Sequence, residues 1–430
     1  MDKLSRHSAF PRAAALACAA LLLAGQAPAR AQAAEHWVGT WAAAPQPAFP
    51  GPQERYTGRT LRLVVHASIG GERWRIRLSN AYGKTPLRIA GAHLARRRQG
   101  ADIDPGSDRP LTFGGHPGVV IAPGATVASD PVQLAVPPLS DLAVSLHARG
   151  TLVADTTHAL AQQTSYVTRA PVDALAAARF PRAKEIGDWP FLTGVEVDAA
   201  DASAIVAFGD SWIDGDGSTP DANARWTDAL AARLQRAGGA CARVAVLNEG
   251  LIGNRLLHGS PEHAMPKAPD FGRALGESGL VRFDRDVLQQ AGAKAVVIHL
   301  GTNDLGLAGG VAPASELPSL EAFVAGYREL AERAHRAGLR AIGTTLTPVE
   351  GVTALPGYDT PDKEALRQRV NEWIRTSGTF DAVVDVDLVV RDPARPARLL
   401  ASLAAPDHLH PTDAGYAAVA DAVPLAFCMR

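Results

Sequence analysis

The second half of the chain alternates short apolar runs with stretches of helical periodicity. From residue 203 onward the apolar runs predict strands at 205–208, 244–247, 295–300, 339–345 and 382–385. Apolar positions spaced three to four residues apart predict helices at about 223–236, 280–290, 320–336 and 363–376, with a closing helix after residue 411. Strands that alternate with helices in this way form a parallel sheet covered on both faces. The pattern therefore predicts an α/β fold, a three-layer α/β/α domain over 203–430.

The first half of the chain follows a period of two. From Trp37 to about Leu160, apolar and polar residues alternate in short runs that glycine-rich turns separate. This pattern predicts an antiparallel β-sandwich-like domain over 34–170. Residues 171–202 are rich in alanine, proline and charge, and we expect them to form a linker over the surface.

The N-terminus carries the features of an export signal. Three basic residues precede an apolar run at 13–25, and small residues at cleavage spacing follow at 29–33. The run is too short to cross a bilayer, so the pattern predicts a signal peptide over 1–33. We therefore expect a secreted or periplasmic protein without a stable membrane anchor.

Removal of the signal peptide leaves two cysteines, Cys241 and Cys428. Cys241 precedes an expected strand, and Cys428 follows the closing helix. Exported proteins often pair such cysteines. The sequence is compatible both with a disulfide between Cys241 and Cys428 and with two free thiols.

The charge balance argues against a nucleic-acid partner. The chain has 43 basic and 44 acidic side chains, so no excess of positive charge favours a phosphate backbone. No His-Glu-x-x-His motif and no cluster with metal-ligand spacing occur in the sequence, so we expect neither a metal nor a cofactor. Nothing in the sequence indicates an oligomeric state.

A serine follows the first strand expected in the α/β region, within Gly209-Asp210-Ser211. Ligands bind at the carboxyl ends of the strands of such a sheet, so the Ser211 hydroxyl is a candidate nucleophile. Gly-Asp-Ser is also an ordinary turn sequence, and the assignment therefore depends on partners for the serine.

A base with an orienting carboxylate lies near the end of the chain, where Asp407 precedes His410 by three residues. A serine becomes a nucleophile when a base takes its proton and another group orients that base. One turn can hold Asp407 against one ring nitrogen of His410 and leave the other nitrogen to face Ser211. His408 is too close to Asp407 for this geometry, and we expect it to be a loop residue.

Two further strand ends offer hydrogen-bond donors for a negatively charged oxygen. Gly253 follows the strand at 244–247 and offers a backbone N–H, whereas Asn303 follows the strand at 295–300 and offers a side-chain amide. Together with the Ser211 N–H they could form an oxyanion hole. Glycine and asparagine are also common in turns, but their coincidence with Ser211 and His410 favours a catalytic site.

These residues lie in four sequence blocks that resemble those of the SGNH hydrolase superfamily, also called GDSL esterases and lipases. The blocks are Gly209-Asp210-Ser211, the stretch 248–253, the stretch 301–304 and the stretch 407–411. The resemblance implies an SGNH-type fold with Ser211 as nucleophile, His410 as base and Asp407 as its orienting carboxylate. It also implies an oxyanion hole made by Ser211, Gly253 and Asn303.

The resemblance covers nearly all of the chain after the signal peptide. Arg225-Trp226 and the stretch 282–286 are similar to those of secreted members with a β-rich region before the catalytic domain. Trp212 stands where many members carry a smaller aliphatic residue, and we expect it to narrow the pocket beside the serine.

The functional hypothesis is an exported serine esterase that acts through an acyl-enzyme on a small-molecule or polysaccharide ester. Short-acyl, acetyl esters of carbohydrates or small alcohols are the expected substrates. A lipase for longer chains, an acyltransferase, and a carbohydrate-binding surface protein with an inert hydrolase fold are the alternatives. We expect the β-rich domain to pack beside the active site and shape its mouth, which His158 could reach.

Overall fold

The computed structural model describes residues 35–49, 51, 53–261, 271–353 and 355–428. The predicted signal peptide at 1–33 lies outside the described residues. None of the helices in the described ranges is long and apolar enough to span a membrane.

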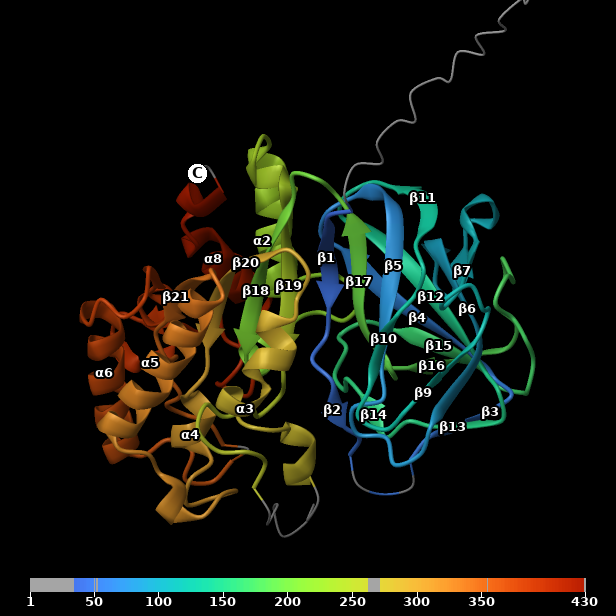
Figure 1. The fold of residues 1–430 in the computed structure, drawn as a ribbon. Coiled ribbons are helices and arrows are strands. Elements are labelled where there is room, and N and C mark those ends of the chain that lie inside the picture. Colours follow the sequence, from blue (N-terminus) through green and yellow to red (C-terminus); the bar gives the residue numbers. More distant parts are fainter. Residues whose placement is uncertain (1–34, 50, 52, 262–270, 354, 429–430) are drawn as a thin grey trace, which may run out of the picture. The chain divides into compact units, whose positions relative to one another are not determined.

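The α/β part contains a five-stranded parallel sheet, as predicted (Figure 1). The strand order is β19-β18-β20-β21-β22, with the bounds β18 (Ser203–Gly209), β19 (Val244–Gly250), β20 (Ala293–His299), β21 (Arg340–Thr344) and β22 (Ala382–Val384). The chain runs outward from β18 in both directions across the sheet. The carboxyl ends of β18, β19 and β20 therefore lie side by side, which is the edge where ligands bind in such sheets.

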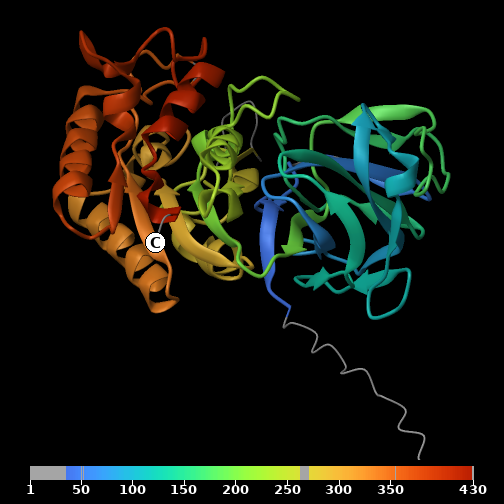
Figure 2. The same ribbon diagram turned by 90° about the horizontal axis from the view of Figure 1, so that it is seen from above.

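Helices cover both faces of this sheet (Figure 2). The helices are α1 (Ser211–Asp214), α2 (Trp226–Ala237), α3 (Gly279–Phe283), α4 (Thr302–Gly306), α5 (Leu320–Arg336), α6 (Pro361–Thr376), α7 (Val386–Val390) and α8 (Asp413–Ala422). Alternate residues of β18 point to opposite sides. Ile205 and Ala207 belong to the same buried cluster as residues of α2 and α8, whereas Val206 and Phe208 belong to the cluster that contains residues of α5 and α6. The three-layer α/β/α prediction is thus confirmed, although the expected helix at 280–290 is α3 followed by a π-helical turn at Asp284–Leu288.

The β-rich part consists mainly of two antiparallel sheets, in agreement with the predicted sandwich. One has the order β1-β17-β5-β10, with β11 also paired to β5: β1 (Trp37–Ala42), β17 (Leu192–Asp198), β5 (Gly71–Ser79), β10 (Thr126–Ala128) and β11 (Val132–Val136). The other has the order β16-β15-β4-β12-β6-β7: β16 (Ala183–Ile186), β15 (Ser165–Thr168), β4 (Thr60–Ala67), β12 (Ser140–Ala148), β6 (Leu87–Gln99) and β7 (Asp102–Ile103). Strands β8 (Arg109–Leu111) and β9 (Val119–Ile121) also pair with β6.

The expectation that 171–202 forms a surface linker is wrong for its second half. β16 and β17 lie within it, and β17 is inserted between β1 and β5. Val195 and Val197 are fully buried on this strand, and the buried Glu196 between them is paired with Arg75. The overall composition of the stretch concealed a seven-residue strand of period two. The division into domains at these bounds stays a prediction.

The β-rich and α/β parts share one continuous apolar core. Val38 and Trp74 belong to the same buried cluster as Val206 and Leu247. The backbone of β1 approaches β19 closely, since a Cβ atom at Gly39 would lie 2.8 Å from the Leu247 side chain. The parts are therefore packed together as core against core.

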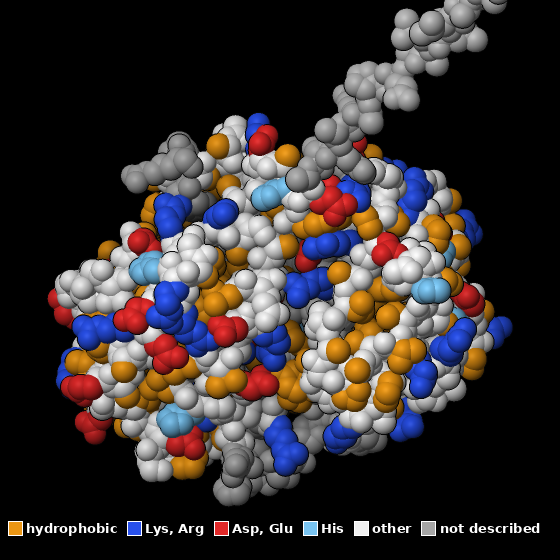
Figure 3. Space-filling model, viewed as in Figure 1, with side chains coloured by type: hydrophobic (Ala, Val, Ile, Leu, Met, Phe, Trp, Pro, Cys, Tyr) orange, Lys and Arg blue, Asp and Glu red, His pale blue; other side chains and the backbone are white. Residues whose placement is uncertain are grey.

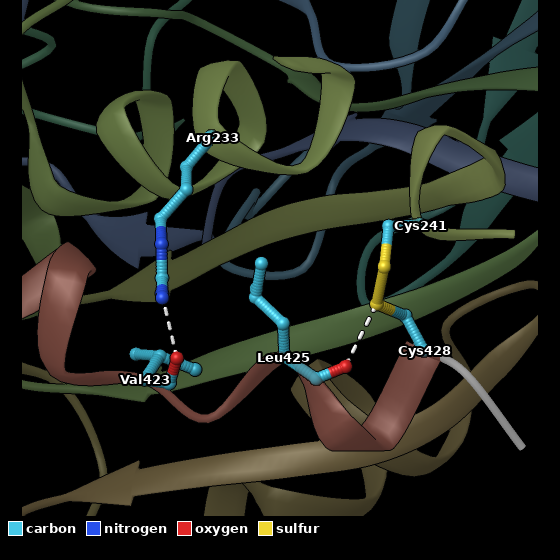
Figure 4. The surroundings of a disulfide bond; sticks show 5 residues. All are labelled: Arg233, Cys241, Val423, Leu425 and Cys428. Carbon is cyan, nitrogen blue, oxygen red and sulfur yellow. Dashed lines mark hydrogen bonds between the residues drawn. A yellow bond between two sulfur atoms is a disulfide. The ribbon is translucent and has the colours of Figure 1, made fainter. Parts of the chain in front are cut away.

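A disulfide joins Cys241 and Cys428, so the open alternative of free thiols is excluded (Figure 4). It ties the end of the described chain to the turn before β19, and beside it Arg233 of α2 donates a hydrogen bond to the Val423 carbonyl at 2.6 Å. The closed loop spans 187 residues. Cross-links of this kind contribute about 2–5 kcal/mol to stability, largely through the unfolded chain.

Basic and acidic side chains are interspersed over the α/β part on the face seen in Figure 3. This arrangement follows from the nearly equal numbers of the two kinds in the sequence. Within the α/β part, neighbouring charges of opposite sign offset one another on that face.

Candidate active site

Ser211 lies where β18 gives way to a helix. Asp210 caps helix α1, and its carboxylate accepts a hydrogen bond from the Trp212 N–H at 3.1 Å. Burial raises the pKa of Asp210 to about 7. Ser211 is thus the first residue of α1, and its own N–H has no acceptor within that helix.

The loop before α8 brings His410 and Asp407 to this serine. The Asp407 carboxylate accepts hydrogen bonds from the backbone N–H groups of Leu409 and His410, which fixes its orientation. Its other oxygen lies 2.6 Å from His410 Nδ1, and His410 Nε2 lies 2.8 Å from Ser211 Oγ. The structure therefore brings the three predicted residues into one hydrogen-bonded series. His408 is exposed at a φ of +59° and takes no part in it.

Trp212 is not placed as expected. It is 2% exposed, and its indole N–H donates a hydrogen bond to the Leu409 carbonyl at 3.0 Å. The ring therefore turns into the core and does not narrow the pocket beside the serine. Instead, Trp212 ties helix α1, which carries Ser211, to the loop that carries His410.

The loop of Gly253 and the Asn303 side chain contact the residues around Ser211, at Asp214 and Asp210 respectively. Gly253 has a φ of +66°, a backbone conformation that favours glycine, and a Cβ atom there would lie 2.6 Å from the Leu275 side chain, which would have to shift. Its N–H donates to no residue in the described ranges. The preceding residue, Ile252, donates its N–H to Asp214 of α1 at 3.0 Å, which holds this loop against the helix of Ser211.

The Asn303 amide is held in one orientation. The Tyr358 hydroxyl donates to its Oδ1 at 2.8 Å, and its Nδ2 donates to the Asn254 carbonyl at 3.1 Å and to Asp210 Oδ2 at 3.3 Å. The donor end of the amide is therefore directed at the turn that carries Ser211. Sequence analysis missed Tyr358, because no local pattern marks a hydroxyl that packs against a residue 55 positions away.

Arg282 contacts the same edge of the sheet, at the end of β18. The sequence marked this residue only as part of a family resemblance. Its guanidinium is fully buried and donates to the Gly209 carbonyl at 2.6 Å and to Asn254 Oδ1 at 2.8 Å. It is also paired with Asp286 at 3.0 Å. Arg282 thus connects the strand end before Ser211 with the loop after Gly253. Its spacing of four residues from Asp286 on a predicted helix was the available signal.

The electrostatic surroundings favour a protonated His410. Burial alone disfavours the imidazolium, but the Asp407 hydrogen bond and the charges of Asp216 and Asp407 outweigh it and raise the pKa of His410. Burial would also raise the pKa of Asp407, yet its hydrogen bonds from His410 hold that pKa well below its usual range. Asp216 lies 3.7 Å from His410 Nε2 and was missed in the sequence. The alternation Asp214-Gly215-Asp216-Gly217 directly after the serine was the available signal.

We expect Asp216→Asn to extend activity to lower pH. His410 must be uncharged to take the serine proton, so its protonation sets the acid side of the pH–rate profile. The charges that raise its pKa are those of Asp407, Asp216 and Asp210. Removal of one of them lowers the pKa of His410, so that the base stays uncharged in more acidic solution. The dependence of kcat/KM on pH measures this shift.

The matched control for this prediction is Asp201→Asn. Asp201 is an exposed carboxylate that pairs with Arg243 near the opposite end of β18. Its loss removes the same charge without changing the surroundings of His410. An acid limb that is unchanged in Asp216→Asn, or shifted equally in both variants, would contradict the prediction.

A hydroxyl, an imidazole with a hydrogen-bonded carboxylate, and a set of N–H donors gather at one sheet edge. Such a set of groups is capable of acyl transfer through a serine. In the described part of the chain, no group of three or more His, Cys, Asp or Glu side chains could hold a metal ion.

Comparison with known proteins agrees with this chemistry. A family model described as GDSL-like lipase/acylhydrolase matches residues 205–423, slightly more than half of the chain. No curated protein matched in the sequence search. Among solved structures, the aryl esterase of M. smegmatis is similar, with 19% identity and a TM-score of 0.36 over 51% of this chain and 96% of its own.

Two other solved structures are similar over the same region. A GDSL-like lipase from Bacteroides thetaiotaomicron has 18% identity and a TM-score of 0.34, and the match covers 51% of this chain and 84% of its own. An alpha/beta hydrolase enzyme from the metagenome of Lake Arreo, Spain, has 21% identity and a TM-score of 0.35, over 52% of this chain and 94% of its own.

Proposed function

Because the chain belongs to the family of GDSL-like lipases and acylhydrolases and is a carboxylic ester hydrolase, we propose that it is an exported serine esterase for short-acyl esters. Ser211 is the proposed nucleophile, His410 the base and Asp407 its orienting carboxylate. The observation that carries the proposal is the hydrogen-bonded series from Asp407 through His410 to Ser211.

The proposed reaction proceeds through an acyl-enzyme. With the ring hydrogen on Nδ1 directed at Asp407, His410 Nε2 accepts the proton of the Ser211 hydroxyl as its oxygen attacks the ester carbonyl. The N–H groups of Ser211 and Gly253 and the Asn303 amide stabilise the resulting oxyanion. His410 then protonates the leaving alcohol, and a water molecule hydrolyses the acyl-enzyme by the same steps.

Polar surroundings of the base support a hydroxyl-rich leaving alcohol. The alcohol leaves beside His410 Nε2, where the partly exposed Asp216 carboxylate lies 3.7 Å away. A carboxylate can accept hydrogen bonds from further hydroxyl groups of a sugar or small polyol, whereas a hydrocarbon chain there would desolvate it. The disulfide and the predicted signal peptide support the export part of the proposal.

The experiment that tests this function compares two chain lengths. We expect the mature protein to hydrolyse p-nitrophenyl acetate with a much higher kcat/KM than p-nitrophenyl palmitate, and to release acetate from acetylated xylan. Preference for the palmitate ester would instead indicate a lipase. No hydrolysis of any of the three would contradict the proposal and favour a carbohydrate-binding protein with an inert hydrolase fold.

A further inference from the structure

A buried histidine of the β-rich part contacts helix α1, which begins with Ser211. His158 follows β14 (Thr156–Thr157) and is 3% exposed. Its Nδ1 lies 2.9 Å from the Ala44 carbonyl, and its Nε2 lies 2.9 Å from Asp214 Oδ1. Ala44 belongs to the β-rich part, whereas Asp214 is the last residue of α1. The ring therefore bridges the two parts of the chain at the helix that begins with Ser211.

The partners of His158 determine its charge. A carbonyl oxygen only accepts hydrogen bonds, so Nδ1 must carry a hydrogen. Nε2 faces a carboxylate, which favours a second hydrogen on the ring. Burial alone would lower the pKa of His158, but the Asp214 charge and hydrogen bond outweigh it and raise that pKa. His158 and Asp214 thus form a buried hydrogen-bonded pair whose contacts favour the charged form of the ring.

Asp214 contacts two parts of the candidate active site, so its hydrogen bond with His158 restrains both. Through its own backbone it belongs to α1, where its N–H donates to the Asp210 carbonyl at 2.9 Å. Its second oxygen accepts the Ile252 N–H at 3.0 Å, directly before Gly253. One carboxylate therefore sets the spacing between the helix of Ser211 and the loop of Gly253.

The segment that follows His158 is itself held against the α/β part. Leu160 and Gln162 have φ values of +49° and +48°, which are costly for residues with side chains. The carbonyl of Ala161 between them accepts a hydrogen bond from Arg225, and Asp221 accepts the Thr164 N–H at 2.6 Å. Surrounding contacts therefore fix this strained segment, and with it the position of the His158 ring.

We propose that His158 is a positioning residue of the active site, which holds Asp214 so that the N–H groups of Ser211 and Gly253 converge on the oxyanion. The β-rich part is on this inference a component of the catalytic machinery. The inference rests on the proposed function, because it concerns the reaction at Ser211.

The test is a set of three variants assayed at 25 °C. His158→Gln removes the ring and leaves the Asp214 carboxylate buried without its hydrogen-bond partner. We expect kcat for p-nitrophenyl acetate to fall about 10- to 100-fold with KM changed less than threefold, since displaced oxyanion donors act on the transition state. Asp214→Asn should cost less, because its amide can donate to a neutral His158 while its oxygen still accepts the Ile252 N–H.

The double variant His158→Gln/Asp214→Asn distinguishes two causes of a lower kcat, which are the loss of positioning by His158 and the burial of an unpaired Asp214 carboxylate. It has no uncompensated carboxylate, so it should fold even if His158→Gln does not. We expect its kcat to remain about tenfold below that of the wild type, because the bridge to the Ala44 carbonyl is still absent.

His93→Gln is the matched control. His93 pairs with Asp108 at 2.9 Å wholly within the β-rich part, and its loss should leave kcat unchanged. The inference is overturned if the double variant has wild-type kcat, or if His158→Gln lowers the melting temperature while kcat is unchanged. An inactive wild-type protein would instead refute the proposed function, so the two failures are distinguishable.

Discussion

Replacement of Ser211 by alanine is expected to reduce kcat for ester hydrolysis by about 10⁴- to 10⁶-fold. Without the hydroxyl there is no atom to form the acyl-enzyme, and His410 is left 2.8 Å from a vacated oxygen position. Substrate binding should be retained, because alanine only removes the Oγ atom and introduces no steric clash. The same variant should lose covalent labelling by a fluorophosphonate, which mass spectrometry of the intact protein measures.

Two further variants sharpen this prediction. His410→Ala should reduce kcat by a similar factor, and the double variant should be no less active than either single one, because the two residues act as one unit. Ser377→Ala, at the end of α6 and outside the site, should have no effect. Labelling or activity that persists in Ser211→Ala would assign the nucleophile to another residue.

Asn303→Ala is the second large effect, with an expected fall in kcat of about 100- to 1000-fold and little change in KM. The amide donates to the oxygen only when it carries negative charge, so its loss raises the barrier without weakening substrate binding. The buried amide is held by Tyr358 and by the Asn254 carbonyl, so the second Nδ2 hydrogen, which Asp210 accepts at 3.3 Å, is the one that would be given to the oxyanion. Steady-state kinetics on p-nitrophenyl acetate measures the separation of kcat from KM.

Asn303→Asp and Tyr358→Phe are the controls for this assignment. Aspartate keeps the shape of the side chain but replaces the donor by a carboxylate beside Asp210, and it should be at least as inactive as alanine. Tyr358→Phe leaves the amide in place and removes only the hydroxyl that orients it, so a loss of about 3- to 10-fold is expected. Equal kcat in Asn303→Ala and the wild type would remove Asn303 from the oxyanion hole.

The placement of the site was predictable because it depends on local patterns. An apolar run marks each buried strand, and parallel strands bring their carboxyl ends to one edge. Ser211 and Asn303 directly follow such runs, so their proximity could be inferred although 92 positions separate them. Asp407 and His410 are only three residues apart, and their pairing needs nothing beyond one turn of chain.

The contacts that orient these groups could not be predicted, because each joins side chains that only the tertiary fold brings together. His158 and Asp214 are 56 positions apart and belong to different parts of the structure. Tyr358 lies in a loop without periodicity. β17 was missed for a related reason, since its partners β1 and β5 lie more than 100 residues earlier.

The shared core limits how evolution or engineering can recombine this chain. Val38 and Trp74 on one side and Val206 and Leu247 on the other belong to one buried cluster, so a cut near residue 200 would leave an apolar surface on both fragments. The α/β fragment would also lose the histidine that faces Asp214. The two parts are therefore not interchangeable modules. A replacement for the β-rich part would have to fit the apolar surface of the α/β part and also supply a partner for the Asp214 carboxylate. This requirement favours inheritance of the β-rich and α/β parts as a single unit.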